Sequence, residues 1–344
     1  MNGAAETTLM FAEASEAAAM VAAQRDLIRG HIATLARRLG ESPPNVVLTC
    51  ARGSSDHAAT FAKYLIETRL GIPTASQAPS IASVYNAPTR AGGALSLAIS
   101  QSGRSPDILA SVAASRRAGA FSAGLVNAEE SPLAALVDCV IPLCAGAELS
   151  VAATKSYIAT LAALIDLVAT WSGDAQLEAA LAAAPRQLEQ AWAADWSPLV
   201  ERLRGARGLY VIGRGFGLGV AQEAALKFKE TCGLHAEAFS SAELRHGPMA
   251  LVKPGFPVLV FRQSDETESG VEDLLAEVVA RGGDVMVAGD APRGAISLRT
   301  TPAQPAIEPM LQIQSFYRAV NALAVARGFD PDRPPHLAKV TETV

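Results

Sequence analysis

The same pattern of strand, turn and helix occurs twice along the chain. An apolar run that begins at Val46 is followed by a glycine-containing turn and a helical pattern, and so is the run that begins at Leu209. A further apolar run follows in each half, beginning at Leu95 and at Val258. Both pairs of runs are offset by 163 residues (46 to 209 and 95 to 258). A preserved offset indicates a duplicated unit, so we predict two similar domains in tandem.

Each half alternates short apolar runs with longer amphipathic segments. Such alternation predicts parallel sheets, and strands that are apolar throughout are typical of sheets covered by helices on both faces. The predicted fold class is therefore α/β, with a parallel sheet flanked by helices in each domain. We expect strands near residues 46–51, 95–100, 121–126, 139–143, 209–213, 257–261 and 284–288, and helices near 54–70, 105–118, 152–172, 217–232, 268–281 and 308–327.

Composition along the chain suggests where the domains begin and end. A segment rich in Ala, Leu, Gln and Glu, residues 176–205, predicts one helix that joins the two halves. Several prolines from Pro331 onward prevent a continuous helix at the end of the chain. We therefore expect an N-terminal helical segment, a first domain, the linking helix, a second domain and a C-terminal tail that closes on the functional site, with the boundaries 1–40, 41–175, 176–205, 206–329 and 330–344.

Composition and charge also exclude some classes of protein. Half of the residues are apolar and 18% are charged, so the chain can bury a large core. A net charge of −5 and the lack of a basic block argue against nucleic acid as a partner. Glu6 and Glu13 interrupt the start, so we expect no signal peptide, and the most apolar helix candidate contains Asp166 and is too short to span a bilayer. We expect a cytoplasmic protein with no membrane partner.

The four cysteines carry little functional information. Cys50, Cys139, Cys144 and Cys232 fit no metal-ligand spacing and are too few for a disulfide scaffold. We therefore expect buried free thiols in a reducing compartment, and no metal site.

The most informative local motif is the run from Ser100 to Asp107 (SQSGRSPD). It follows a predicted buried strand and opens a predicted helix, where Ser105 can cap the helix and Pro106 suits its first position. Free backbone N–H groups at a helix start, together with the hydroxyls of Ser100, Ser102 and Ser105, form a phosphate cradle. The alternative is an ordinary helix cap with polar loop residues, and the spacing alone does not separate the two.

A second turn of this kind follows the first predicted strand. Gly53 permits close backbone approach, and Ser54 and Ser55 offer hydroxyls for sugar or phosphate oxygens, although a simple cap at Ser55 would look the same. Open parallel sheets bind ligands at the carboxyl ends of their strands, where both turns are expected. Two such turns favour a binding site in the first domain.

Titratable candidates lie in the second half. Lys227 and Glu230 are three residues apart on a predicted helix and share a face, either as an acid–base pair or as a surface ion pair. His246 precedes Gly-Pro and is either an acid–base candidate or an incidental residue of a turn. Lys339 lies in the tail, where a lysine is usually just solvated.

Taken together, six motifs in the same order resemble the sugar-isomerase (SIS) family, and within it the isomerase half of glutamine–fructose-6-phosphate aminotransferase. The resemblance covers the chain from about residue 10 to the end. It implies two tandem SIS domains of the flavodoxin-like three-layer αβα type. The motifs are Ser100-Gln-Ser-Gly, Gly146-Ala-Glu-Leu-Ser-Val-Ala-Ala-Thr-Lys155, Glu223-Ala-Ala-Leu-Lys-Phe-Lys-Glu230, His235-Ala-Glu-Ala, Glu243-Leu-Arg-His-Gly-Pro248 and His336-Leu-Ala-Lys339.

The resemblance implies catalytic roles on a hexose 6-phosphate. Glu230 matches the residue that moves a proton between C1 and C2, and Lys227 matches the lysine that assists at the developing enediol oxygen. His246 matches the residue that opens the pyranose ring; in the family it reaches across from a neighbouring subunit, so we expect a homodimer. Lys339 matches the lysine that forms a Schiff base with the ketose. This chemistry requires no metal or organic cofactor.

Substrate contacts are implied in the same way. The side chains that match phosphate or sugar contacts come from the two turns of the first domain, and two further contacts are made by the backbone. They are Ser100, Gln101, Ser102 and Ser105 for the phosphate, Gly53, Ser54 and Ser55 for sugar or phosphate oxygens, and Val151 and Ala338 for the sugar.

Some positions depart from the family pattern. The aminotransferase carries a glutaminase domain with a cysteine after the start methionine, whereas residue 2 here is Asn2, so we expect the chain not to hydrolyse glutamine. Arg52 replaces a cysteine and Arg104 replaces an acidic residue, which raises the positive charge near the expected phosphate. Ala153 replaces a serine and removes a hydroxyl that could contact the sugar.

Without a glutaminase, the expected activity is deamination of glucosamine 6-phosphate to fructose 6-phosphate and ammonia. Related enzymatic alternatives are a galactosamine-6-phosphate deaminase, another phosphosugar isomerase and a fructosamine-6-phosphate deglycase. A synthase subunit that is fed by ammonia or by a partner chain is a further alternative. From a different class, a non-catalytic sugar-phosphate sensor remains open, although the retained acid–base residues argue against it.

Overall fold

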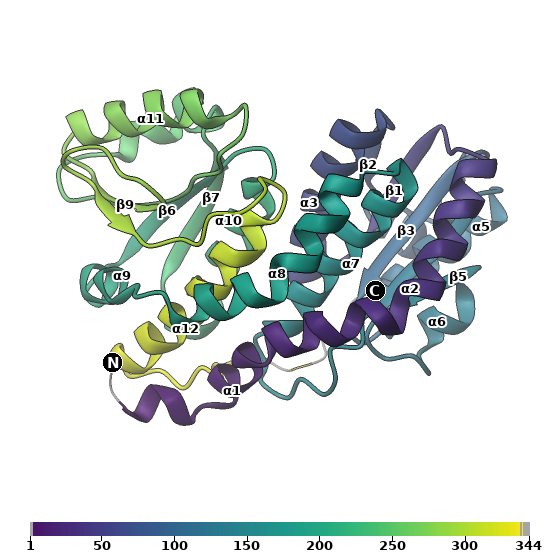
Figure 1. Ribbon diagram of the computed structural model, residues 1–344, viewed down its shortest axis with the longest axis horizontal. Coiled ribbons are helices and arrows are strands. Elements are labelled where there is room, and N and C mark those ends of the chain that lie inside the picture. The colour runs from purple at the N-terminus through teal and green to yellow at the C-terminus, as the bar shows by residue number, and fades with distance from the viewer. Residues whose placement is uncertain (1–2, 338, 340–344) are drawn as a thin grey trace. The chain divides into compact units, whose positions relative to one another are not determined.

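The computed structural model describes residues 3–337 and Lys339 (Figure 1). Contacts within the chain define two compact units. One comprises residues 19–148 and 155–182 with Lys339, and the other comprises residues 3–18, 149–154 and 183–337. Each unit contains one five-stranded sheet. None of the described helices is both long and apolar enough to cross a membrane.

The first sheet is parallel, with the order β2-β1-β3-β4-β5. Its central strand, β3, is buried along its whole length, and Leu97 there lies opposite Thr49 of β1 and Ala123 of β4. From β1 the chain adds β2 on one side and then β3, β4 and β5 on the other side. Because connections between parallel strands are right-handed, connections that run in opposite directions place their helices on opposite faces of the sheet. The strands are β1 (Val46–Cys50), β2 (Thr74–Ser76), β3 (Ala94–Ser100), β4 (Phe121–Val126) and β5 (Cys139–Pro142).

Two groups of helices cover this first sheet. Helices α3 and α7 pack on one another, and α5 packs against both α4 and α6. The long apolar helix α7 is buried from Lys155 to Ala169, which explains why its sequence is apolar on all sides. The helices are α2 (Ala17–Glu41), α3 (Ser54–Leu70), α4 (Ser80–Ser83), α5 (Pro106–Arg117), α6 (Pro132–Leu136) and α7 (Lys155–Ser172).

The second sheet is also parallel, with the order β10-β9-β8-β6-β7. Helix α11 lies on one face of it, and α10 and α12 lie on the other (Figure 1). The strands are β6 (Gly208–Gly213), β7 (His235–Ser240), β8 (Pro257–Phe261), β9 (Asp284–Ala288) and β10 (Ile296–Leu298). The helices of this unit are α1 (Leu9–Ser15), α9 (Ser197–Leu203), α10 (Gly217–Cys232), α11 (Glu268–Ala280) and α12 (Glu308–Ala326), with short 3-10 helices η1 (Gly3–Thr7), η2 (Glu243–His246) and η3 (Pro248–Leu251).

The predicted duplication is confirmed by strand order. When β1 to β5 are matched in sequence with β6 to β10, both sheets have the order second-first-third-fourth-fifth. The α/β class and the two tandem domains are therefore confirmed. The expected domain boundaries at 41–175 and 206–329 stay a prediction.

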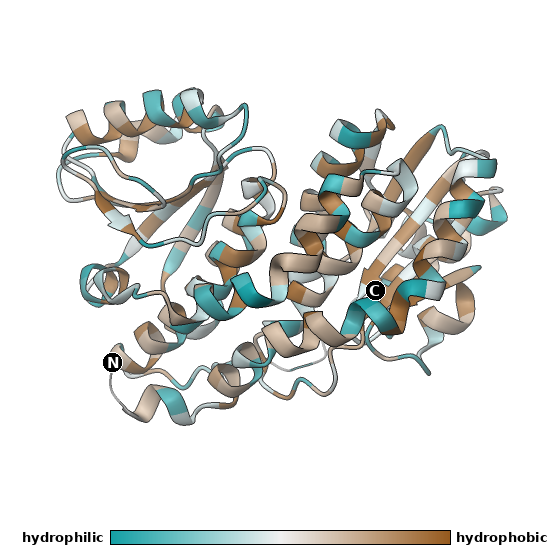
Figure 2. Cartoon of the chain, in the orientation of Figure 1, coloured by the Kyte–Doolittle hydropathy of each residue, from teal (hydrophilic) through white to brown (hydrophobic). Residues whose placement is uncertain are grey.

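Apolar side chains hold each sheet to its helices, and Figure 2 shows apolar segments along the strands of both sheets. In the second sheet, Val258 and Val260 of β8 and Val285 of β9 pack with Leu274 and Leu275 of α11. Full burial of one such side chain contributes about 1.5–3 kcal/mol. The apolar runs that predict these strands in the sequence therefore supply the side chains of this core.

The expected single helix over 176–205 is wrong. The structure has two helices, α8 (Ala175–Ala193) and α9, with a break around Asp195 and Trp196. The Asp195 carboxylate accepts the backbone N–H of Ser197 at 2.9 Å, and Pro198 stands in the first turn of α9, which favours a new helix start. The Trp196 indole is buried and donates to the carbonyl of Arg299 at 2.8 Å.

Three strands were not expected from the sequence: β2, β7 and β10. β2 and β10 have three residues each, and all three lie at the edges of their sheets. β7 exposes His235 and Glu237, so its sequence lacks the apolar run on which strand prediction depends.

Candidate active site

Two turns at the carboxyl ends of β1 and β3 carry the predicted phosphate contacts. Gly53 adopts φ 56° and ψ −133° immediately before α3, a backbone conformation that other residues rarely take, and Ser54 and Ser55 begin that helix. After β3, the Ser100 hydroxyl accepts the N–H of Gly103 at 3.0 Å. A Cβ at Gly103 would lie 2.1 Å from the Ser131 hydroxyl oxygen, so this turn requires glycine. Both turns are thereby held in tight, defined shapes.

Ser105 occupies the N-cap position of α5, but its expected capping bond is wrong: within the described chain its side chain makes no capping hydrogen bond. Pro106 stands at the start of α5 as predicted. The Ser105 hydroxyl is therefore not used to cap the helix and can serve a ligand. The positive end of the α5 dipole faces the same turn, which favours an anion there.

An ion pair that the sequence did not reveal supports these turns. Arg52 donates from Nε and Nη2 to Oδ2 of Asp107, at 2.9 and 2.8 Å. Asp107 is buried, whereas the Arg52 side chain is 50% exposed. The carboxylate thus fixes a half-exposed guanidinium next to Gly53. The sequence showed only that Arg52 departs from the family pattern.

In the corresponding turn of the second sheet, after β8, hydrogen-bond donors are bound by another residue of the chain. Ser264 donates to the Glu308 carboxylate from its backbone N–H at 2.8 Å and from its hydroxyl at 2.6 Å. Burial raises the pKa of Glu308. A cavity of about 420 Å³ beside this turn is lined by charges of both signs, the carboxylates of Glu268, Asp290 and Glu308 and the guanidinium groups of Arg262 and Arg299. Because the donors of Ser264 already bind a carboxylate, this turn is less suited to an anion than the equivalent turn of the first sheet.

Helix α10 carries a buried charge cluster. The Lys227 ammonium is 2.6 Å from Oε2 of Glu230 and 3.2 Å from Oε1 of Glu223. Lys227 and Glu223 are fully buried, while the Glu230 side chain is 21% exposed. Tyr317 of α12 donates its hydroxyl to Glu223 at 3.1 Å. The alternative of a surface ion pair is therefore wrong.

These contacts set the charge state of the cluster. Burial alone would lower the pKa of Lys227, but the carboxylates of Glu223 and Glu230 and their hydrogen bonds raise it above its ordinary value. Lys227 is therefore an ammonium at neutral pH, and Glu230 is the member of the cluster that is partly open to solvent. Sequence reasoning did not assign a role to Glu223, although its i,i+4 spacing to Lys227 could have shown the pairing.

His246 is exposed at the end of η2, followed by Gly247 with φ 133°. Over residues 3–337 and Lys339, no hydrogen bond or ion pair joins His246 to Lys227 or Glu230. Its expected action from a neighbouring subunit stays a prediction.

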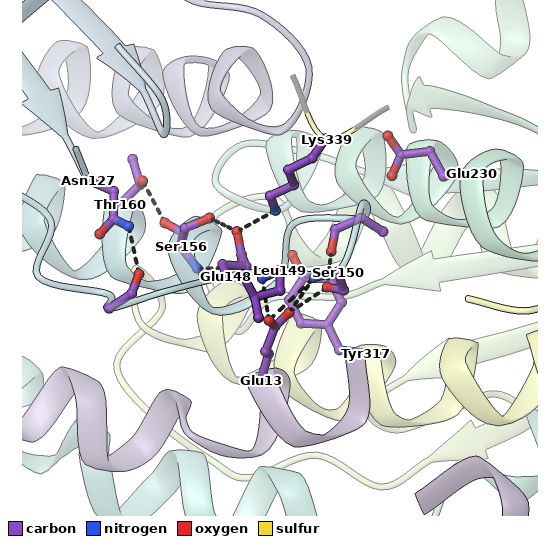
Figure 3. Close-up of polar contacts among 12 residues, drawn as sticks. Glu13, Asn127, Glu148, Leu149, Ser150, Ser156, Thr160, Glu230, Tyr317 and Lys339 are labelled. Carbon is purple, nitrogen blue, oxygen red and sulfur yellow. Dashed lines mark hydrogen bonds and ion pairs between the residues drawn. The ribbon is translucent and has the colours of Figure 1, made fainter. Parts of the chain in front are cut away.

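Lys339 does not stand free in solvent, contrary to the usual reading of a tail lysine. Its ammonium lies 3.3 Å from Oε2 of Glu148, in the loop between β5 and α7 (Figure 3). Glu148 also accepts the backbone N–H and the hydroxyl of Ser156, at 3.2 and 2.6 Å. Ala338, the other tail residue expected at the site, lies outside the described residues. Sequence reasoning did not single out Glu148.

The following part of this loop is bound by a second buried carboxylate, Glu13 of α1 (Figure 3). Glu13 accepts the backbone N–H of Leu149 and both the N–H and the hydroxyl of Ser150. These bonds hold the backbone just before Val151, which is half-buried and was expected to contact the sugar. Glu13 is thus a further residue that the sequence did not reveal.

The cysteines offer no nucleophile for this site. Cys50 and Cys232 are buried as expected, whereas Cys139 and Cys144 are only partly buried. Burial raises the pKa of the Cys50 thiol, and likewise that of Cys232, to about 12, so both stay protonated at neutral pH. In the described part of the chain, no group of three or more His, Cys, Asp and Glu side chains could hold a metal ion.

Comparisons with known proteins agree with the predicted fold and family. The model of the SIS domain family matches residues 43–170 and 202–326. The isomerizing glutamine–fructose-6-phosphate aminotransferase of Aeropyrum pernix is 36% identical over 313 residues, which cover 85% of this chain and 50% of that protein. The chain thus spans about half the length of the curated relatives it matches.

Solved structures give the same result. A protein from Silicibacter pomeroyi DSS-3, provisionally described as a phosphosugar isomerase, superposes with a TM-score of 0.90 at 42% identity, covering 94% of this chain and 100% of that chain. The C-terminal domain of glucosamine–fructose-6-phosphate aminotransferase from Francisella tularensis superposes with a TM-score of 0.85 at 26% identity, covering 97% and 100%.

Proposed function

This chain belongs to the SIS domain family of phosphosugar isomerases, and from that premise we propose that it is an enzyme that converts glucosamine 6-phosphate and water into fructose 6-phosphate and ammonia. The observation that carries the proposal is the cluster on α10. It keeps Lys227 charged in the interior and leaves the Glu230 carboxylate partly accessible beside it. Aldose–ketose conversion needs this combination, because a base must move a proton between C1 and C2 while a cation stabilises the enediol oxygen.

The other proposed roles follow the distribution of charge and hydroxyls. The turns at Gly53 and at Ser100 to Ser105 hold the phosphate, whose binding energy positions the reacting carbons. His246, supplied by the second subunit of a homodimer, opens the sugar ring. Lys339 forms a Schiff base at C2 and displaces the amino group as ammonia.

The direction of the reaction is proposed from mass action. Isomerisation and transfer of the amino group are reversible, and the water that drives hydrolysis is present in large excess over free ammonia. The same residues would run the reaction toward the amino sugar only with a concentrated ammonia supply. We therefore expect deamination in dilute ammonia.

The proposal is tested by measuring ammonium release from glucosamine 6-phosphate, with galactosamine 6-phosphate in parallel. We expect release from the glucosamine compound together with an equal amount of fructose 6-phosphate. Release from the galactosamine compound alone would assign the other epimer. No release from either compound, with fructose 6-phosphate still bound, would contradict the deaminase proposal and favour another isomerase, a deglycase or a partner-dependent synthase.

A pair of serine variants tests which turn binds the phosphate. We expect Ser102→Ala to weaken binding of fructose 6-phosphate by about tenfold to a hundredfold, because one hydrogen bond to a charged group is lost. The matched variant Ser264→Ala, at the equivalent turn of the second sheet, removes a bond to Glu308 and is expected to leave this affinity unchanged. Calorimetric titration of both variants is the measurement. A loss of affinity in Ser264→Ala but not in Ser102→Ala would show that the phosphate binds at the second sheet and would contradict the proposed phosphate site.

A further inference from the structure

Glu148 lies beside the nitrogen atom that carries a positive charge in the proposed chemistry. Its side chain is fully buried, and its Oε2 lies 3.3 Å from the Nζ of Lys339, the atom proposed to bond to the sugar. The two residues are 191 positions apart in the chain, so only folding brings them together. Burial of a carboxylate is unfavourable unless cations and hydrogen-bond donors surround it, and Lys339 and Ser156 supply both.

The carboxylate is held in one orientation by the start of α7. Oε1 accepts the N–H of Ser156 and Oε2 accepts its hydroxyl, so the carboxylate lies at the N-terminal end of α7, where the helix dipole is positive. A plain helix cap would need only these bonds. The contact with Lys339 uses the same Oε2 and goes beyond capping.

We propose that Glu148 is the counter-ion of the protonated Schiff base on Lys339, an inference that rests on the proposed function. When the ammonium of Lys339 condenses with the C2 carbonyl, R–NH₃⁺ and O=C become R–NH⁺=C and one water. The N–C2 bond forms, the C2–O bond breaks, and the oxygen leaves with two protons from the ammonium. The charge on Nζ is therefore the same before and after the step.

A fixed carboxylate at this distance stabilises both cations. It orients the ammonium of Lys339 before the sugar bonds to it, and it favours the protonated imine over the neutral one. The protonated imine is the better electrophile at C2, so it is the form that water attacks to release fructose 6-phosphate. Glu148 thus acts through Lys339 as a positioning residue, without contacting the substrate in this assignment.

Borohydride trapping tests the role without requiring turnover. The full chain is mixed with fructose 6-phosphate and borohydride, which delivers a hydride to C2 of the imine and leaves a stable secondary amine on Lys339, detected by peptide mass. We expect Glu148→Gln to slow trapping by about tenfold or more, because a charged partner is removed while the shape is kept. Glu148→Asp keeps the charge but withdraws it from Nζ, and it should fall between Glu148→Gln and the unmodified protein.

Asp138→Asn is the matched control. Asp138 also accepts the N–H and the hydroxyl of one serine, Ser122, and it pairs with Arg116 and not with Lys339, so we expect a lower melting temperature with trapping within about twofold of the unmodified protein. If Glu148→Gln does not fold, Glu148→Asp still gives a result. If every folded variant at position 148 is trapped as fast as the unmodified protein, the proposed role of Glu148 is wrong, while the Schiff base on Lys339 stands. No trapping in the unmodified protein would overturn both the Schiff base on Lys339 and this role, whereas normal trapping without ammonia release would count against the deaminase alone.

Discussion

Glu230→Gln is expected to lower kcat for ammonia release by about 10²–10⁴-fold, the range that a positioned general base contributes. The amide has nearly the same shape as the carboxylate but cannot take a proton from C1 or C2. In this variant Lys227 still has its second carboxylate partner, Glu223, at 3.2 Å, so we expect the structure around α10 to persist. The KM is expected to change little, because the proposed phosphate contacts come from the turns of the first sheet and not from α10.

Deuterium from solvent gives a second measurement of the same step. A base that moves a proton between carbons exchanges some of it with water, so fructose 6-phosphate formed in D₂O should carry deuterium with the unmodified protein and far less with Glu230→Gln. Glu201→Gln, at an exposed carboxylate of α9, serves as the control and should behave as the unmodified protein. Unchanged ammonia release and unchanged deuterium content in Glu230→Gln would show that another group transfers the proton.

Lys227→Met is expected to lower the free energy of unfolding by about 3–5 kcal/mol, because it leaves Glu223 as a buried carboxylate without its cation. Methionine keeps the length of the side chain, so the change isolates the charge. This loss of unfolding free energy should become smaller as the pH falls. Without the ammonium of Lys227, burial raises the pKa of the Glu223 carboxyl in this variant. Protonation of Glu223 at low pH then removes the unpaired buried charge. Urea unfolding at two pH values measures both effects.

Two further variants show whether burial is the cause. Adding Glu223→Gln to Lys227→Met should recover a large part of the lost stability, because the unpaired charge is then gone. Arg37→Met breaks an exposed ion pair with Glu41 on α2, at 3.6 Å, and should cost less than about 1 kcal/mol. A small effect of Lys227→Met, or no recovery in the double variant, would mean that water reaches Glu223.

The duplicated architecture explains why one chain can carry two similar turns with different uses. Both follow the third strand of their sheets in chain order. In the second sheet the chain supplies its own carboxylate, Glu308, to the turn at Ser264. In the first sheet the nearby carboxylate, Asp107, is instead paired with the half-exposed guanidinium of Arg52. We infer that the two copies have diverged, with the first specialised for phosphate and the second for the acid–base cluster.

Sequence alone determined the parts of this protein that depend on local chemistry. The α/β class and the duplication follow from the apolar runs and from their repeated spacing along the chain. The pairing of Lys227 with Glu230 follows from helical spacing. The family resemblance added the candidate roles, which no property of a single residue could supply.

Only the tertiary structure decided which of these residues are buried and which distant partners they meet. Spacing along α10 could not distinguish a surface pair from an interior one, because packing on α12 and the bond from Tyr317 make the difference. The contacts of Glu148 with Lys339 and of Glu13 with Ser150 join segments 191 and 137 residues apart. Such pairs leave no periodic pattern in the sequence, since burial and desolvation arise only when the whole chain has folded around them.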